Sequence, residues 1–181
     1  VGTGDGAGKN RGSANRKGNT GRRDDWGAVD PESGGEVSQK AVKAATDLYA
    51  LGGTYSYDCA DDGLHAVNVT VGGGSFTILS GDDGMHADEE MTVNGGVIDI
   101  TQCYEGLEGT NVTVNGGEIR IVASDDAVNA SGGNDGSGFG GRGWGGTGTA
   151  TGDTGWLTIT GGQIAVSAGG DGLDSNGSIS I

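Results

Sequence analysis

The sequence predicts an all-β fold, a right-handed parallel β-helix (a β-solenoid) with coils of 21 to 22 residues, because two signatures recur in one phase. A Gly-Gly dipeptide begins at Gly52, Gly73, Gly95, Gly116 and Gly161. A turn rich in acidic residues begins at Asp61, Asp82, Tyr104, Asp125 and Gly170. Repeats of this length form units that bury a continuous core only by stacking on their neighbours, as in a solenoid.

Each repeat predicts two short strands joined by the Gly-Gly dipeptide. Residues 69–71 (Val-Thr-Val) precede one dipeptide, and residues 76–78 (Phe-Thr-Ile) follow it. Alternation with period two is typical of strands that bury one face, and glycine supplies the positive φ that a sharp corner requires. We therefore expect Val and Ile to face inward. The apolar residues after the acidic turns should also stack inside: Leu64, Met85, Leu107, Val128 and Leu173.

The segment 36–50 allows two interpretations. A Ser-Gly-Gly-Glu sequence before it resembles a capping box, which would start a helix. By period, however, residues 40–44 lie 22 residues before an acidic repeat, and the stretch 38–53 ends in the same Gly-Gly dipeptide. We favour a solenoid coil, which would place Lys40 and Lys43 at the head of the acidic turns.

Two segments fall outside the period. Residues 1–35 are rich in Gly, Asn and Arg and predict an irregular N-terminal arm or cap, so the solenoid domain is expected to span 36–181. The spacing of 45 residues between Gly116 and Gly161 holds one coil and a Gly-rich insertion at about 132–155. Insertions in repeat proteins lie on one face, which is often the binding face, and a flexible loop is the alternative.

The charge of the chain restricts its partners. There are 25 Asp and Glu against 10 Lys and Arg, a net charge of -15. Nucleic acid and anionic membrane surfaces are therefore poor partners, and no apolar run approaches the ~18 residues of a membrane span. Cations, or polyanions bridged by cations, are favoured. The chain starts at Val1 without Met, from which we expect a removed leader and an extracellular or cell-surface location.

The two cysteines are expected to be free. Cys59 and Cys103 fall two coils apart. At the spacing of adjacent strands, their Cα atoms would be about 9–10 Å apart, beyond the roughly 7 Å that a disulfide tolerates.

The acidic turns predict a metal site. Carboxylates in successive coils would lie about 5 Å apart, where their repulsion costs on the order of 1 kcal/mol per pair. Calcium, which takes about six to eight oxygen ligands, would offset this repulsion, so we expect Ca²⁺ as the cofactor. A merely solvated acidic face is the alternative. The candidate metal ligands are Asp61, Asp62, Asp82, Asp83, Glu105, Glu108, Asp125, Asp126, Asp171 and Asp174.

Further polar residues share the phase of these turns. His65 and His86 lie one repeat apart, and two stacked imidazoles either hold a transition metal or hydrogen-bond the neighbouring Asp residues. The candidate ligand-binding residues are Lys40, Lys43, His65, His86 and Asn129.

Several motifs carry a family resemblance. Asp-Asp-Gly-x-His-Ala, Tyr-Glu-Gly-Leu-Glu-Gly, Asn-x-Thr-Val-x-Gly-Gly and Lys-Ala-Val-Lys-Ala, over residues of about 38–181, resemble a bacterial family of extracellular carbohydrate-binding β-solenoids. That family is similar to pectate lyases in fold, binds calcium, and is associated with polygalacturonate and cellulose. By this resemblance, Asp82, Asp83 and the group 171–174 correspond to the calcium-binding turn of the related lyases. His86 replaces the last Asp of that turn, which departs from the pattern.

Together, the acidic turns and the resemblance predict calcium-dependent binding of acidic polysaccharides such as polygalacturonate, with cellulose as a further ligand. Catalysis is not predicted, because a polyuronate lyase needs a Lys or Arg base. The chain has no Lys after Lys43, Arg120 is expected to face outward on a strand, and Arg142 falls in the insertion. A lyase remains an alternative. The other alternative is structural, a calcium-stabilised filament or surface layer built by head-to-tail self-association.

Overall fold

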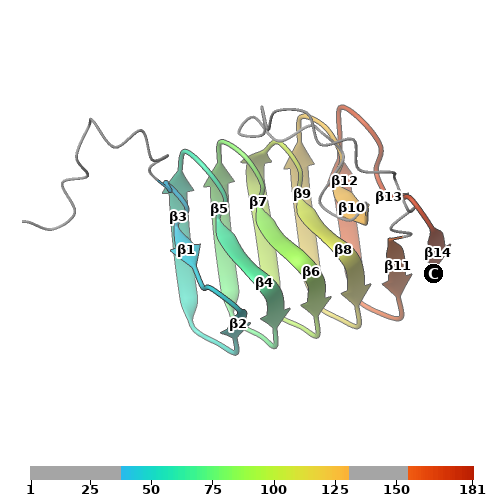
Figure 1. Ribbon diagram of the computed structural model, residues 1–181, viewed down its shortest axis with the longest axis horizontal. Coiled ribbons are helices and arrows are strands. Elements are labelled where there is room, and N and C mark those ends of the chain that lie inside the picture. The colour runs from blue at the N-terminus through green and yellow to red at the C-terminus, as the bar shows by residue number, and fades with distance from the viewer. Residues whose placement is uncertain (1–37, 131–154) are drawn as a thin grey trace, which may run out of the picture. The chain divides into compact units, whose positions relative to one another are not determined.

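The computed structural model describes residues 38–130 and 155–181, and their regular structure consists of two parallel β-sheets (Figure 1). The predicted arm at 1–35 and nearly all of the predicted insertion lie outside these residues. The strands of the first sheet, sheet A, are β1 (Val42–Lys43), β2 (Asp47–Ala50), β4 (Leu64–Val71), β6 (Met85–Val93), β8 (Leu107–Val114), β10 (Val128–Ala130), β11 (Trp156–Ile159), β13 (Asp174–Ser175) and β14 (Ser178–Ser180). The strands of the second sheet, sheet B, are β3 (Thr54–Cys59), β5 (Ser75–Ser80), β7 (Val97–Cys103), β9 (Glu118–Ala123) and β12 (Gln163–Ser167).

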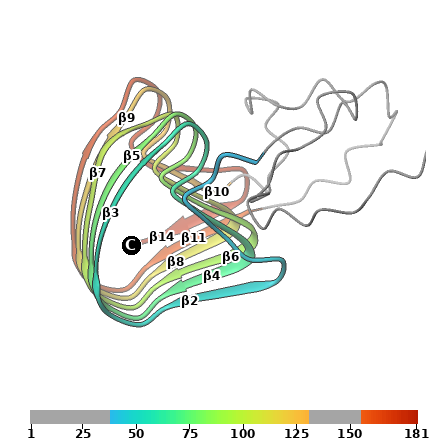
Figure 2. The same ribbon diagram turned by 90° about the vertical axis from the view of Figure 1, so that its left-hand side faces the viewer.

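The chain alternates between the two sheets and so forms a parallel β-solenoid, which confirms the predicted fold class. The five strands of sheet B mark five coils. Leu64 pairs with Met85, and Met85 with Leu107, so equivalent residues of successive repeats lie side by side. Viewed along the axis, the coils superpose (Figure 2). Within residues 38–130 and 155–181, no helix has the length and apolarity needed to cross a membrane.

The first coil resolves the ambiguity of the segment 36–50. Strand β1 pairs with β4, with Val42 opposite Leu64, and β2 pairs with a later part of β4. The coil interpretation is therefore correct over residues 38–50, and the helix alternative is wrong there. The pairing with the second coil decides the structure, because the burial of Leu48 in the shared core outweighs a local capping signal.

The insertion interrupts a strand of sheet A. Strand β10 pairs with the beginning of β8, and β11 pairs with the end of the same strand. The two flanks of 131–154 thus occupy the position of one strand. Subtracting these 24 residues from the spacing of 45 leaves 21, the length of an ordinary coil.

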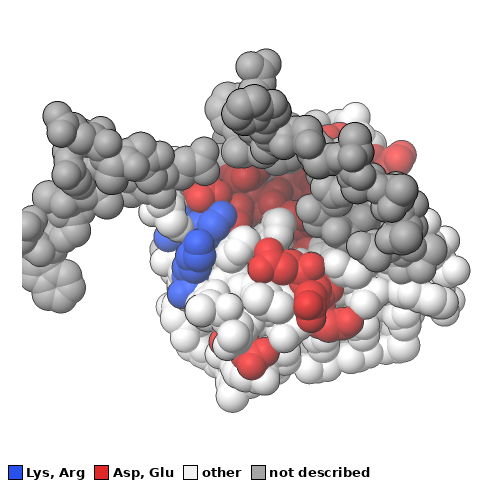
Figure 3. All heavy atoms as spheres, viewed as in Figure 1, with Lys and Arg blue, Asp and Glu red and all other residues white. Residues whose placement is uncertain are grey.

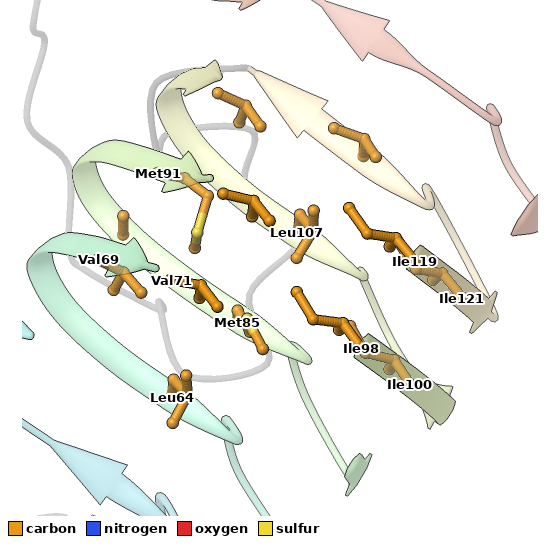
Figure 4. Packing of buried hydrophobic residues seen from close by; sticks show 14 of the residues in the cluster. Leu64, Val69, Val71, Met85, Met91, Ile98, Ile100, Leu107, Ile119 and Ile121 are labelled. Atoms are coloured by element: carbon orange, nitrogen blue, oxygen red, sulfur yellow. The ribbon is translucent and has the colours of Figure 1, made fainter. Parts of the chain in front are cut away.

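The core follows the predicted alternation. Leu64, Met85 and Leu107 are each at most 1% exposed and follow one another from coil to coil (Figure 4). The inward residues of sheet B, among them Ile98, pack in the same cluster. Both thiols are free, as expected: that of Cys103 is buried and that of Cys59 is half-buried.

The Gly-Gly corners carry the positive φ that the sequence predicts. In each dipeptide the second glycine has φ between 97° and 106°. The corner is also crowded, because a Cβ on Gly96 would lie 2.9 Å from the carbonyl oxygen of Gly74 in the previous coil. The first glycine is freer, since a Cβ on Gly95 would meet its nearest atom, the carbonyl oxygen of Gly72, at 3.5 Å.

We predict that Gly96→Ala lowers the free energy of unfolding by about 1–3 kcal/mol, because a non-glycine residue is strained at this φ. Gly95→Ala is the matched control and should change stability much less. Urea denaturation of both variants tests this. Equal destabilisation by the two substitutions would contradict the assignment of the strain to the second glycine.

Candidate functional site

The acidic turns join each strand of sheet B to the next strand of sheet A, and they align three rows of polar side chains along the axis. The outer turn row is the first residue of each turn: Asp61, Asp82, Tyr104, Asp125 and Gly170. The inner turn row, aligned by hydrogen bonds between coils, is Lys40, Asp62, Asp83, Glu105, Asp126 and Asp171. The strand row, aligned by strand pairing, is Lys43, His65, His86, Glu108, Asn129 and Asp174.

At the N-terminal end, a lysine forms ion pairs with the first aspartates and a histidine hydrogen-bonds one of them. Lys40 Nζ lies 2.9 Å from Asp61 Oδ1 and 2.5 Å from Asp62 Oδ2, and His65 Nδ1 lies 2.8 Å from Asp62 Oδ2. Burial would raise the pKa of Asp62, but the hydrogen bonds from His65 and Lys40 lower it to about 2. The predicted position of Lys40 at the head of the acidic turns is confirmed, whereas Lys43 is exposed in the strand row.

One coil further, His86 lies between two buried carboxylates. Its Nδ1 is 2.9 Å from Asp83 Oδ2 and also contacts Glu108 Oε2. Burial would lower the pKa of His86, but Asp83 and Glu108 raise it to about 11. Burial raises the pKa of Asp83 to about 7, helped by Glu108 and opposed by the hydrogen bond to His86. The trio therefore retains a proton at neutral pH.

Backbone N–H groups satisfy other oxygens of the inner turn row. The N–H of Asp83 donates to Asp62 Oδ1 at 3.3 Å, and the N–H of Glu105 donates to Asp83 Oδ1 at 3.3 Å. Asn129 Nδ2 donates to Glu105 Oε2 at 3.0 Å. These contacts offset part of the repulsion between stacked carboxylates without an ion, because each carboxylate accepts a hydrogen bond from the next coil.

The C-terminal end of the rows differs. It carries Asp125, Asp126, Asp171 and Asp174, and among the described residues no Lys, Arg or His forms an ion pair with any of them. Burial raises the pKa of Asp126, the hydrogen bond from the Asp171 N–H opposes this, and the charges of Asp125, Asp174 and Asp171 raise the pKa further. A Cβ on Gly170 would collide with Oδ1 of both Asp125 and Asp126, so these two oxygens converge on space that only glycine leaves free.

The rows bring the predicted residues into three compact clusters. In each cluster the candidate ligand atoms lie within 4.8 Å of one another. The clusters are Asp61, Asp62 and Asp82; Asp62, His65 and His86; and Asp83, His86 and Glu108. Both histidines hydrogen-bond a neighbouring Asp through Nδ1, which is one of the two interactions expected of them.

Two polar residues near the site were not predicted. Tyr104 donates its hydroxyl to Asp125 Oδ2 at 2.6 Å. Asp88 lies in β6, where Ala66 pairs with Ala87 but Asn68 pairs with Glu90, so β6 holds one extra residue. This bulge accounts for the Gly-Gly spacing of 22 residues between Gly73 and Gly95, where the two neighbouring spacings are 21. The sequence therefore contained a signal for the bulge, although not for the direction of the Asp88 side chain.

Comparison with known proteins supplies the class of ligand. A family model described as carbohydrate-binding domain-containing protein matches residues 11–84 and again residues 67–141. Together the two matches span residues 11–141, more than half of the 181 residues. The chain belongs to this family of carbohydrate-binding domain-containing proteins. No curated protein and no solved structure matches it significantly.

The described surface of this carbohydrate-binding domain is strongly acidic. Residues 38–130 and 155–181 contain 17 Asp and Glu but only three Lys and Arg, namely Lys40, Lys43 and Arg120. Figure 3 shows acidic side chains gathered in patches on one face, with basic side chains at its edge. A free anionic sugar would be repelled by such a surface.

We predict that, in metal-free buffer, the free energy of unfolding falls as the pH rises from about 4 toward 11. Burial raises the pKa of Asp82 to about 6 and that of Asp83 to about 7, and the carboxylates beside His86 overcome its burial and raise its pKa to about 11. The folded domain thus keeps protons that the unfolded chain has released, and their contribution is lost with rising pH. Asp62 acts in the opposite sense, since its lowered pKa of about 2 makes its contribution disappear as the pH falls from about 4 to 2.

Urea denaturation between pH 4 and 9 tests the prediction, with Asp82→Asn as the comparison. This variant should show a shallower slope between pH 4 and 6, because it lacks one of the retained protons. A stability that increases from pH 4 to pH 8 would contradict the assignment of these protons.

Proposed function

We propose that this carbohydrate-binding domain binds acidic polysaccharides, such as polygalacturonate, through Ca²⁺ held at its acidic turns, in an extracellular or cell-surface setting. The observation that carries the proposal is the convergence of the Asp125 and Asp126 carboxylates over Gly170, with no cationic partner among the described residues. Asp171 and Asp174 belong to the next coil and supply further carboxylates.

The donor set at this end suits calcium. Calcium takes oxygen ligands at about 2.3–2.6 Å and tolerates irregular geometry, and Asp125, Asp126, Asp171 and Asp174 offer only oxygen. When bound, Ca²⁺ would supply coordination positions that a uronate carboxylate or sugar hydroxyls can fill. This accounts for an acidic domain that binds an acidic polymer, since the ion bridges two surfaces that otherwise repel each other.

The N-terminal end fits calcium less well. There the ammonium of Lys40 already lies against Asp61 and Asp62, and His86 lies against Asp83 and Glu108. A calcium ion would have to displace these groups. We therefore place the calcium-binding function at the C-terminal coils rather than along all ten predicted ligands.

A neutral glycan such as cellulose would use a different surface. Trp156 is 57% exposed on β11 and Tyr49 is 65% exposed on β2, both on sheet A, and exposed aromatic rings offer an apolar face to a sugar ring. Trp156→Ala therefore distinguishes the two ligands: it should weaken cellulose binding and leave calcium-dependent polyuronate binding unchanged.

Head-to-tail self-association stays a prediction, which size-exclusion chromatography with and without chelator tests.

The test of the proposal is isothermal titration of the chelator-stripped protein with Ca²⁺, followed by polygalacturonate with and without Ca²⁺. We predict that Ca²⁺ binds and that glycan binding requires it. The double variant Asp125→Asn/Asp126→Asn should lose both, because the two converging carboxylates are its ligands.

The matched control is Asp58→Asn/Glu118→Gln, which removes the same charge from two exposed residues of sheet B. It should retain both kinds of binding. If Ca²⁺ binds and the glycan does not follow, the ion is a structural staple and the proposal is wrong.

A further inference from the structure

Two imidazole rings stack on the outer face of the second and third coils. His65 and His86 pair in register, with ring centroids 4.8 Å apart and an angle of 25° between the rings. Their side chains are 16% and 17% exposed, so the rings are largely but not fully enclosed.

Buried carboxylates fix the orientation of both rings. Nδ1 of His65 lies 2.8 Å from Asp62 Oδ2, and Nδ1 of His86 lies 2.9 Å from Asp83 Oδ2. A ring that donates its Nδ1 proton to a carboxylate can present the lone pair of Nε2 to a metal, and carboxylates hold metal-ligating histidines in this way. In both rings, therefore, Nε2 is the atom available to a ligand.

The bulge in β6 brings a third donor to the two Nε2 atoms. Asp88 Oδ1 lies 3.7 Å from Nε2 of His65 and 3.5 Å from Nε2 of His86. Both distances are too long for good hydrogen bonds. Each distance, taken by itself, is however one that two ligand atoms about 2.1 Å from the same ion would have, at an angle of about 113–124°. Because the ring centroids lie 4.8 Å apart, the two rings would tilt toward each other for both Nε2 atoms to reach one ion.

We infer that His65, His86 and Asp88 form a binding site for a borderline divalent cation such as Zn²⁺, separate from the calcium-binding carboxylates. Two imidazole nitrogens and one carboxylate oxygen leave at least one coordination position open to water or to a sugar hydroxyl. Calcium is not the ion expected here, because it prefers oxygen to imidazole nitrogen.

The charge around the rings favours a divalent ion. Four carboxylates, those of Asp62, Asp83, Asp88 and Glu108, contact the two imidazoles, and Lys40 is the additional cation beside Asp62. These carboxylates outnumber the nearby positive charges. A divalent ion that replaces an Nε2 proton would therefore reduce the excess of negative charge around the rings. Binding should therefore release protons to the buffer.

The test uses the full chain without a polyhistidine tag, stripped with chelator and titrated with Zn²⁺ by calorimetry in two buffers of different ionisation enthalpy. Co²⁺, titrated in parallel, reports a tetrahedral site by its visible absorption. We expect one equivalent of Zn²⁺ with proton release. His65→Ala and Asp88→Ala should each weaken Zn²⁺ binding by more than the 10–100-fold typical of losing a second-shell partner, at least about 100-fold.

Glu89→Ala is the matched control for Asp88→Ala, because it removes the same charge from the adjacent exposed residue, and it should leave Zn²⁺ affinity unchanged. His86 is avoided as the test residue, since its removal would leave Asp83 and Glu108 buried without their partner. Wild-type Zn²⁺ affinity in His65→Ala or Asp88→Ala, or displacement of Zn²⁺ by an equal concentration of Ca²⁺, would overturn the inference. Neither result bears on calcium-dependent glycan binding, which Asp125 and Asp126 test separately.

Discussion

The rest of the structure depends on one constraint: equivalent residues of successive coils stack at the spacing between adjacent strands of a sheet. It aligns Leu64, Met85 and Leu107 into a core that a single repeat could not bury. The same stacking forces the acidic turns into rows, because a residue that faces outward in one coil lies beside its equivalents in the next. Burial of the core and crowding of carboxylates are therefore two consequences of one geometry.

The solenoid relieves this crowding differently along its axis. At the N-terminal coils the protein provides its own cations, Lys40 and His86, and backbone N–H groups. At the C-terminal coils the described residues provide no cation, although the Tyr104 hydroxyl donates to Asp125 and the Asp171 N–H donates to Asp126. Gly170 leaves the space between these two carboxylates free. One repeated turn thus yields a self-neutralised segment at one end and, in our proposal, a calcium-binding segment at the other. Within the N-terminal segment, the histidine pair and Asp88 combine nitrogen and oxygen donors and, in our inference, suit a different class of ion.

Periodicity was sufficient to predict the fold, the inward residues and the corner glycines, because in a solenoid the sequence repeat and the structural repeat coincide. It also placed Lys40 correctly, since position in the repeat outweighed a local helix signal. It could not distinguish Asp62, whose pKa falls to about 2, from Asp83, whose pKa rises to about 7, because the difference comes from partners in adjacent coils. The direction of Asp88 was equally inaccessible, since it depends on how the bulged strand bends.

The central claim is that different coils of one acidic repeat hold different ions. Anomalous diffraction from a crystal soaked with both Ca²⁺ and Zn²⁺, recorded on either side of the zinc absorption edge, tests it most directly. The account predicts a calcium peak beside Asp125 and Asp126 and a zinc peak between His65, His86 and Asp88. A single kind of ion at both positions, or no ion at either, would contradict it.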